Sequence, residues 1–450
     1  MIATSRPLPP RMPSPRRLAL ALAPLALLAP AALAGQAARP AFAPSDPARV
    51  VRLPAVRRAL DTLRATNAWT LEQQVSICEI PAPPFKERAR GEELARRFRT
   101  LGLVNVRTDA EGNVLGERPG TVQDAPTVVL SGHLDTVFPE GTDVRVKRDS
   151  IPFAGEGGGV RLTAPGIGDD CRGLAVLLAV ARAMKAADVR TPGTVVFVGT
   201  VGEEGAGNLR GVRRLFAETL KGQVDYFISV DGTGFGTTSR AVGSTRLAVT
   251  FAGPGGHSYG DFGMPNPIHA LGRAVARLAD LSVPAAPRTT FNVGVITGGQ
   301  TVNSIASRAS FDLDMRSESA EALADLERRA RAALDTALAA ERARWPRSSA
   351  PLTMEIRDIG RRPAAAPRDD APIVRTALAA ARALGVTSTT SASSTDANVP
   401  MSLGIPAITI DGGGRGEGAH SPAERYEDGP RGWLGPQWAA VLVAALGGAR

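Results

Sequence analysis

Histidine is scarce in this chain, and three of the four histidines lie in glycine-rich or strand-end contexts beside acids or small residues. The four are His133, His257, His269 and His420. His133 follows the apolar run 127–132, and Asp135 comes two residues later, so alternation along a strand would point both side chains to one side. An aspartate in that position can orient the ring of a metal-binding histidine or stabilise its charge. The pair is a candidate for metal chemistry, and an ordinary strand terminus is the alternative.

Two pairs of adjacent acids point to the same chemistry. Asp169 and Asp170 lie in a glycine-rich stretch directly before a predicted helix, 173–187. Because neighbouring carboxylates repel each other, the pair indicates a cation close by, although one of the two could instead cap the helix. A cap accounts for Asp170 and leaves Asp169 unexplained. Glu203 and Glu204 follow another predicted strand, where one carboxylate can bind a metal while its neighbour handles a proton.

Two further candidates come later in the chain. Asp231 directly follows the apolar run 226–230, and His420 follows the glycine-rich stretch 411–418. Open α/β sheets place their sites at the carboxyl ends of strands, so these residues and the earlier ones are expected to converge. Such a set of imidazoles and carboxylates suits two zinc ions, with manganese or cobalt as alternatives. One carboxylate shared by two cations about 3.5–4 Å apart would make a two-metal hydrolytic site.

The elements that must position these residues alternate between helices and apolar strands. Predicted strands at 127–132, 194–200 and 226–230 are interleaved with helices, which indicates a mostly parallel sheet covered on both faces. From 241 to 359 the order becomes strand, helix, two strands, helix and strand, which is typical of an α+β domain of the ferredoxin-like type. Residues 360–450 return to α/β character. We therefore expect an α/β catalytic domain split by an inserted α+β domain.

The first residues predict export from the cytosol. Arginines are followed by an apolar stretch that prolines interrupt and that is too short for a comfortable membrane span, and Ala32-Leu33-Ala34 fits a cleavage site. We expect a periplasmic or secreted protein with no stable membrane span after processing. The predicted segments are the signal peptide 1–34, an Ala/Pro-rich linker 35–48, the catalytic domain in two parts, 49–240 and 360–450, and the inserted domain 241–359.

Composition argues against a nucleic-acid partner. The formal net charge is +9, but four arginines lie within the first 34 residues and others are scattered along alanine-rich helices. Aromatic residues make up 4% of the chain, which is too few for a base-stacking surface.

The two cysteines, Cys78 and Cys171, are expected by default to be unpaired small core residues. An oxidising compartment would permit a bridge between them. The sequence does not determine whether they are close enough to form one.

Over residues 50–446 the chain resembles the zinc exopeptidase family that includes aminoacylase, carnosinase, carboxypeptidase G, tripeptidase and succinyl-diaminopimelate desuccinylase. Five separated motifs occur in family order. They are His133-Leu134-Asp135-Thr136, Gly168-Asp169-Asp170, Glu203-Glu204, Asp231 and His420. The chain departs from many relatives after the aspartate pair, where Cys171-Arg172-Gly173 replaces a lysine-containing run.

The resemblance implies a role for each motif residue. The implied metal ligands are His133, Asp169, Glu204, Asp231 and His420, for two zinc ions per subunit. Asp169 would bridge the two ions, and Asp135 would lie behind His133. Glu203 would be the general base, which takes a proton from water and passes it to the leaving amine. Residues 394–398 resemble a loop that supports the site in the family.

The inserted domain resembles the family's lid, which often also forms a homodimer. His257 matches a lid histidine that stabilises the oxyanion, often across the dimer interface. Asn303 and Arg316 match lid positions that hold the carboxylate of the substrate, and an ion pair of Arg316 with Asp314 is the alternative. His269, inside an apolar helix, is expected to be structural.

These features predict metal-dependent hydrolysis of an amide bond in a small peptide, by a di- or tripeptidase or a carboxypeptidase-like enzyme. The run from His133 to Pro139 is most similar to the tripeptidase and carboxypeptidase G branch. That similarity favours a peptidase over an N-acyl-amino-acid deacylase, which is the main alternative. A catalytically silent protein that binds peptides or metal is the alternative from another class, and the presence of Glu203 argues against it.

Overall fold

The computed structural model describes residues 43–153, 157–368 and 370–450 of the chain. The predicted signal peptide, 1–34, and the first part of the predicted linker lie outside these residues. None of the helices in the described part of the chain combines the length and the apolar character that a membrane crossing needs.

The main sheet has eight strands, in the order β1-β2-β6-β3-β7-β16-β8-β15. Strands β6, β3, β7 and β16 run parallel to one another, whereas β2 and β8 pair antiparallel with β6 and β16. The strands are β1 (Val104–Thr108), β2 (Val114–Arg118), β3 (Thr127–His133), β6 (Thr194–Thr200), β7 (Tyr226–Val230), β8 (Gly236–Ala241), β15 (Thr389–Ser393) and β16 (Ala407–Ile410). The three predicted apolar strands are thus confirmed, and they lie side by side in the sheet.

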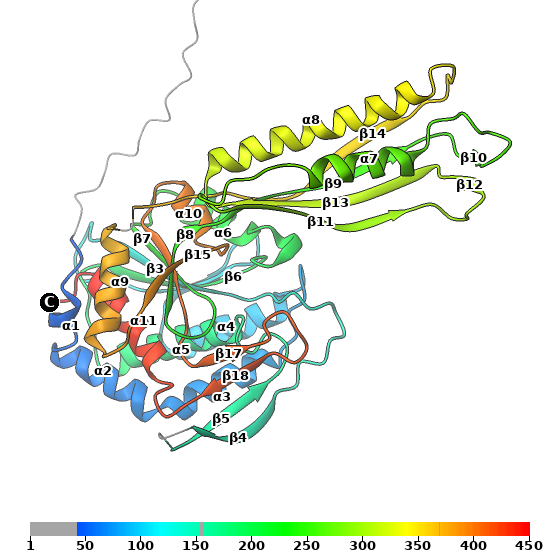
Figure 1. Cartoon of the computed structure of the whole chain (residues 1–450). Coiled ribbons are helices and arrows are strands. Elements are labelled where there is room, and N and C mark those ends of the chain that lie inside the picture. The colour runs from blue at the N-terminus through cyan, green and yellow to red at the C-terminus, as the bar shows by residue number, and fades with distance from the viewer. Residues whose placement is uncertain (1–42, 154–156, 369) are drawn as a thin grey trace, which may run out of the picture. The chain divides into compact units, whose positions relative to one another are not determined.

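Helices cover both faces of this sheet (Figure 1). On β3, Val128 and Leu130 belong to the core under one set of helices, and Val129 between them belongs to the core on the other face. The first core contains α1 (Pro47–Val50), α2 (Pro54–Ala65), α3 (Asn67–Cys78), α4 (Arg88–Thr100), α5 (Cys171–Ala186), α9 (Pro372–Ala383) and α11 (Leu434–Leu446). The second contains α6 (Arg210–Arg214), the helical turn Leu215–Thr219 and α10 (Asn398–Ser402).

The segment between β8 and α9 forms a second, antiparallel sheet with the strand order β11-β13-β9-β14. Its elements are β9 (Gly243–Ala252), α7 (Pro267–Ala279), β11 (Thr289–Gly298), β13 (Arg308–Ser317), α8 (Ala320–Arg344) and β14 (Thr353–Arg362), with the short strands β10 (Gly256–His257) and β12 (Ser304–Ile305). Helices α7 and α8 pack on the sheet through a core of their own. The element order is the predicted one, so an α/β fold with an inserted α+β ferredoxin-like domain is confirmed.

A third sheet, also antiparallel, was not predicted from the sequence. Its order is β17-β18-β5-β4, with β4 (Lys147–Phe153), β5 (Gly157–Thr163), β17 (Arg415–Glu417) and β18 (Arg425–Asp428). Strands β17 and β18 have only three and four residues, and β4 and β17 are largely exposed, so they lack the apolar run that marks a buried strand. The sheet holds the segment after His420 against the segment that leads to Asp169.

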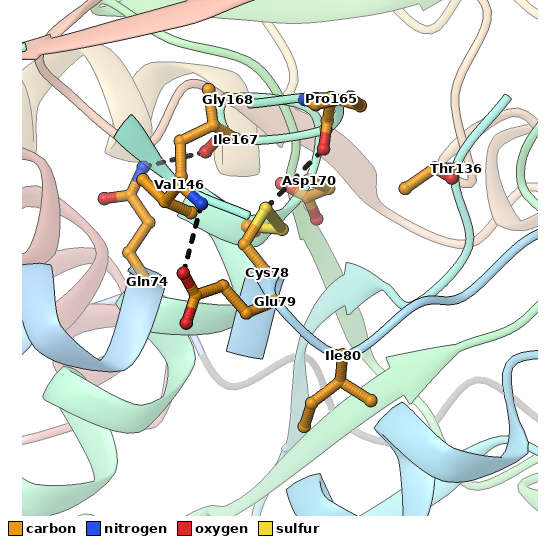
Figure 2. The surroundings of a disulfide bond; sticks show 12 residues. Gln74, Cys78, Glu79, Ile80, Thr136, Val146, Pro165, Ile167, Gly168 and Asp170 are labelled. Atoms are coloured by element: carbon orange, nitrogen blue, oxygen red, sulfur yellow. Dashed lines mark hydrogen bonds between the residues drawn. A yellow bond between two sulfur atoms is a disulfide. The ribbon is translucent and has the colours of Figure 1, made fainter. Parts of the chain in front are cut away.

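The expectation of two unpaired cysteines is wrong. Cys78, the last residue of α3, and Cys171, the first residue of α5, form a disulfide with a Cα–Cα distance of 5.4 Å. Figure 2 shows this bridge beside the loop of Pro165, Ile167 and Gly168. The two cysteines are 93 positions apart, so only the packing of α3 against α5 brings them together.

We predict that breaking this bridge lowers stability, because a cross-link over 93 residues restricts the unfolded chain. The expected loss is about 2–4 kcal/mol, measured from urea unfolding with and without dithiothreitol. The chain has two cysteines, so the reductant acts on this bridge alone. The double variant Cys78→Ala/Cys171→Ala is the control, and its unfolding should not respond to the reductant. Equal stability of the oxidised and reduced wild type would contradict the prediction.

Candidate metal centre

Parallel strands bring their carboxyl ends, and the side chains that follow them, to one edge of the main sheet. His133 is the last residue of β3, and Asp231 directly follows β7. Glu203 and Glu204 follow β6, which lies on the other side of β3. The convergence expected from the strand ends is therefore present in the fold.

Two groups of side chains that could hold a metal ion share Asp169. One group is His133, Asp169 and Asp231, and the other is Asp169, Glu204 and His420. Within each group the ligand atoms all lie within 4.8 Å of one another. Nε2 of His133 lies 2.8 Å from Oδ1 of Asp169, whereas Nε2 of His420 lies 3.1 Å from Oδ2. Asp169 thus offers one oxygen to each group, as a carboxylate that bridges two cations does.

The remaining distances complete the two groups. Nε2 of His420 lies 3.0 Å from Oε1 of Glu204, and Nε2 of His133 lies 4.0 Å from Oδ1 of Asp231. His133 is fully buried, and the side chain of His420 is 57% exposed. The cluster is therefore enclosed on the β3 side and open to solvent at the His420 loop.

The electrostatics of the cluster call for positive charge. Burial, and then the charge of Asp169, raise the pKa of Asp231 well above its ordinary range. Hydrogen bonds to Asp169 and Glu204 raise the pKa of His420 to about 10. Neighbouring carboxylates contribute to both shifts, through the charge of Asp169 on Asp231 and through the hydrogen bonds of Asp169 and Glu204 to His420. Cations bound between these side chains would offset that negative charge, so the donor set fits a metal centre.

The two members of the aspartate pair have different partners. Asp170 caps α5, because its carboxylate accepts hydrogen bonds from the backbone N–H of Gly173 at 2.9 Å and of His133 at 2.8 Å. The predicted helix cap at Asp170 is confirmed, and Asp169 is the member that faces the cluster. The peptide bond between the two aspartates is cis.

The side chain of Asp135 was expected to orient the ring of His133, but it binds the backbone of the glutamate pair instead. Its carboxylate accepts hydrogen bonds from the backbone N–H of Glu203 at 3.1 Å and of Glu204 at 2.8 Å. The ring Nδ1 of His133 lies 3.1 Å from the carbonyl oxygen of Asp135 and 3.8 Å from its carboxylate. Asp135 therefore orients the histidine mainly through its main chain, and its side chain fixes the glutamate pair.

Glu203 is buried and ion-paired with Arg362, the last residue of β14. Nη1 of Arg362 donates to Oε1 of Glu203 at 2.9 Å, and Nη2 donates to its carbonyl oxygen. Burial raises the pKa of Glu203 to about 8, against the charge of Arg362, which lowers it. The loop at 394–398 also reaches this place, because Ser394 accepts from Arg362 at 3.2 Å. Asp396 of the same loop accepts from Thr200 at 2.5 Å.

Sequence patterns do not single out Arg362. It is one of 53 basic residues, and no motif in the chain distinguishes it from Arg361 beside it. The arrival of an arginine at a buried acid is decided by where β14 ends, which is a tertiary property.

The residues predicted to touch substrate lie outside the two groups. His257 is exposed in β10, and its Nδ1 accepts from the backbone N–H of Gly260 at 3.2 Å. Asn303 is exposed too, and Arg316 pairs with Asp314 at 2.7 Å, which is the alternative that the sequence left open. None of the metal-ligand groups found among the described residues contains His257. His269 is exposed on α7, with Nδ1 3.9 Å from Glu341.

Comparison with known proteins identifies a family. The model of "Peptidase family M20/M25/M40" matches residues 129–431. The chain is 28% identical over 255 residues to carboxypeptidase G2 of Pseudomonas sp. (strain RS-16), a match that covers 55% of this chain and 59% of that enzyme. The match thus spans less than two thirds of the length of its relative.

Solved structures show the same fold. A tripeptidase of Staphylococcus aureus subsp. aureus Mu50 superimposes with a TM-score of 0.68 at 21% identity, covering 84% of this chain and 98% of that one. Aminopeptidase PepT of Bacillus cereus ATCC 10987 gives a TM-score of 0.66 at 20% identity, with the same coverage of 84% and 98%.

Proposed function

The chain belongs to the peptidase family M20/M25/M40, and on this premise we propose that it hydrolyses amide bonds in small peptides at a centre of two zinc ions. The observation that carries the proposal is the position of Asp169, which presents one carboxylate oxygen to each of two ligand groups. A bridging carboxylate between two cations is the arrangement of two-metal hydrolases.

We assign one ion to His133, Asp169 and Asp231 and the other to Asp169, Glu204 and His420. Imidazole and carboxylate ligands without thiolate suit zinc, and they accept manganese or cobalt as well. Bound there, the ions would polarise the amide carbonyl and lower the pKa of the attacking water.

Glu203 is the general base in this proposal. Glu203 also forms a third group of possible ligands with His133 and Glu204. We do not assign it to a metal, because its carboxylate is ion-paired with Arg362. The Glu203 carboxylate takes a proton from water as the water oxygen attacks the amide carbon. When the carbon–nitrogen bond breaks, Glu203 returns that proton to the leaving nitrogen, so a carboxylic acid and an amine are formed. The carboxylate of Asp135 keeps Glu203 in place by accepting a hydrogen bond from the backbone N–H of Glu203.

A small peptide is the proposed substrate, with an N-acyl amino acid as the alternative. The likeness to carboxypeptidase G2 supports the peptide. A protein without activity that binds peptide or metal is the rival from another class, and the buried, positioned Glu203 speaks against it because binding alone does not need a base.

We further propose that the inserted domain forms a homodimer and that His257, with Asn303 and Arg316, acts on substrate from that domain. Strand β11 is an edge strand, and its Val295 and Ile296 are 51% and 57% exposed. An exposed apolar edge strand is a surface that a second copy can cover. The exposure of His257 fits a role across such an interface, because it is free to meet a partner subunit.

Export to the periplasm or the exterior is also our proposal. The Cys78–Cys171 disulfide supports it, since structural disulfides persist in oxidising compartments. Fractionation of the cells that produce the protein tests this, and a purely cytosolic location would refute it.

We predict that Glu203→Gln lowers kcat by about 10²–10⁴-fold, because the amide cannot take the proton. Zinc content, measured by atomic absorption, should stay at two ions per chain. The matched control is Glu140→Gln, an exposed glutamate that pairs with Lys86 and should keep full activity. Unchanged turnover by Glu203→Gln would remove Glu203 from the mechanism.

Zinc-dependent release of amino acids is expected from a panel of di- and tripeptides. Chelation should abolish this release, and added zinc should restore it, because zinc then binds to the proposed ligands again. Amino-acid analysis of the products measures both. Turnover of N-acyl amino acids without turnover of any peptide would establish the deacylase alternative instead.

Analytical ultracentrifugation tests the dimer. The wild type is expected to sediment as a dimer and Val295→Glu as a monomer, because a buried, unpaired carboxylate destabilises an interface. Val104→Glu, on the edge strand β1 of the main sheet, is the control, since Val104 is 45% exposed and lies outside the inserted domain. A monomeric wild type at micromolar concentration would refute the proposal.

A further inference from the structure

The loop between β5 and α5 determines where Asp169 lies. Only two backbone hydrogen bonds hold this loop to itself, from Ile167 to Ala164 at 3.2 Å and from Cys171 to Gly166 at 3.1 Å. Because Asp169 belongs to both ligand groups, a displacement of this loop would disturb both at once. The loop therefore needs support from outside.

The carboxylate of Glu424 supplies that support. Its Oε1 accepts hydrogen bonds from the backbone N–H of Gly168 at 2.8 Å and of Asp169 at 2.9 Å. Its Oε2 accepts from the backbone N–H of Gly166 at 2.9 Å. Glu424 is 2% exposed, so these bonds are shielded from water. A carboxylate has two oxygens that can each accept more than one hydrogen bond, so one side chain satisfies all three N–H groups.

Two glycines of the loop allow this close contact. A Cβ atom at residue 168 would lie 3.1 Å from Oε1 of Glu424, so glycine lets the backbone approach the carboxylate. Gly166 has φ of +76°, which glycine adopts without the penalty of a side chain. Consecutive backbone N–H groups that point to one place form a concave site for an anion. Here the anion is a side chain of the same chain.

Glu424 also ties this loop to the segment of His420. The backbone N–H of Glu424 donates to Ser421 at 3.1 Å, and its carbonyl oxygen accepts from Ala164 at 3.0 Å. His420 and Asp169, 251 positions apart in the chain, thus lie on segments joined by one residue. Two contacts from α3 hold the same loop (Figure 2). The side-chain amide of Gln74 donates to the carbonyl oxygen of Ile167 at 2.8 Å, and the disulfide joins Cys78 to Cys171, directly after the loop.

We propose that Glu424 is a positioning residue for the metal centre: by accepting three backbone N–H groups, it places Asp169 between the two ligand groups and couples it to His420. This inference rests on the proposed two-metal function. It assigns Glu424 no contact with substrate or metal. Its effect is on the affinity of both ions, because Asp169 is common to both groups.

Substitutions of Glu424 in the full chain separate this role from a merely structural one. In Glu424→Gln one oxygen still accepts from two N–H groups, but the amide NH₂ then faces a third N–H and cannot accept from it. In Glu424→Ala all three acceptors are lost. Glu427→Gln is the matched control, because Glu427 lies in β18 three residues away and pairs with Arg161 at 2.7 Å rather than with the loop.

Zinc affinity by chelator competition and the cobalt(II) absorption spectrum are the readouts. We expect about 10–100-fold weaker zinc binding in Glu424→Gln, a typical loss when a partner of a ligand is removed, and a larger loss in Glu424→Ala. The cobalt bands should shift in both variants and stay unchanged in Glu427→Gln. Wild-type zinc affinity and spectrum in Glu424→Gln would overturn the proposal, even if its metal-free form melted at a lower temperature.

Hydrogen exchange of the wild type tests the same contact without a substitution. The amides of Gly166, Gly168 and Asp169 should be strongly protected, and rapid exchange there would overturn the proposal even if the variants failed to fold. A wild type that binds no metal would instead refute the proposed function. The two failures are thus distinguishable, because protection of these amides is measured independently of metal binding.

Discussion

Carboxylates crowd together at one edge of the main sheet, and much of the surrounding structure serves to hold them there. Asp169, Glu204 and Asp231 belong to two groups whose ligand atoms lie within 4.8 Å of one another. Two like charges about 4 Å apart repel by roughly 4 kcal/mol at an effective dielectric constant of about 20. Each group places two carboxylates beside a histidine. This repulsion needs compensation, and divalent cations bind the donor types that are present.

The protein separates its acids by what they face. Asp135, Asp170 and Glu424 point at backbone N–H groups, seven hydrogen bonds in all, and each of these bonds fixes a segment that bears a ligand or the proposed base. The carboxylates of the two groups are left facing one another. Fixed backbone N–H groups satisfy the buried carboxylate oxygens of the first set without adding a cation that would compete with metal.

The inserted domain contributes to this edge at the end of β14, where the chain returns to the catalytic domain. Arg362 at the end of β14 reaches Glu203, and the backbone N–H of Arg361 donates to the side chain of Asn208 at 2.8 Å. The inserted domain has its own core, and the end of its strand β14 contacts the segment after β6. The same domain presents an exposed edge strand and His257 elsewhere on its surface. Its connection to the metal centre is therefore through the end of β14.

Periodicity and side-chain chemistry are local, so sequence patterns predicted the apolar strands, the ferredoxin-like order of the insert and the acid pairs after strand ends, and they marked the scarce histidines. The choice of Asp169 over Asp170 as the metal ligand rested on the family resemblance, the cysteines were predicted to be unpaired, and neither Arg362 nor Glu424 was singled out. Each of these was decided by contacts between distant parts of the chain. The cysteines are 93 positions apart, Arg362 and Glu203 are 159, and Glu424 and Asp169 are 255. Such pairs meet only when helices pack together or the sheet brings its loops to one edge, and local sequence patterns do not show which distant residues will meet.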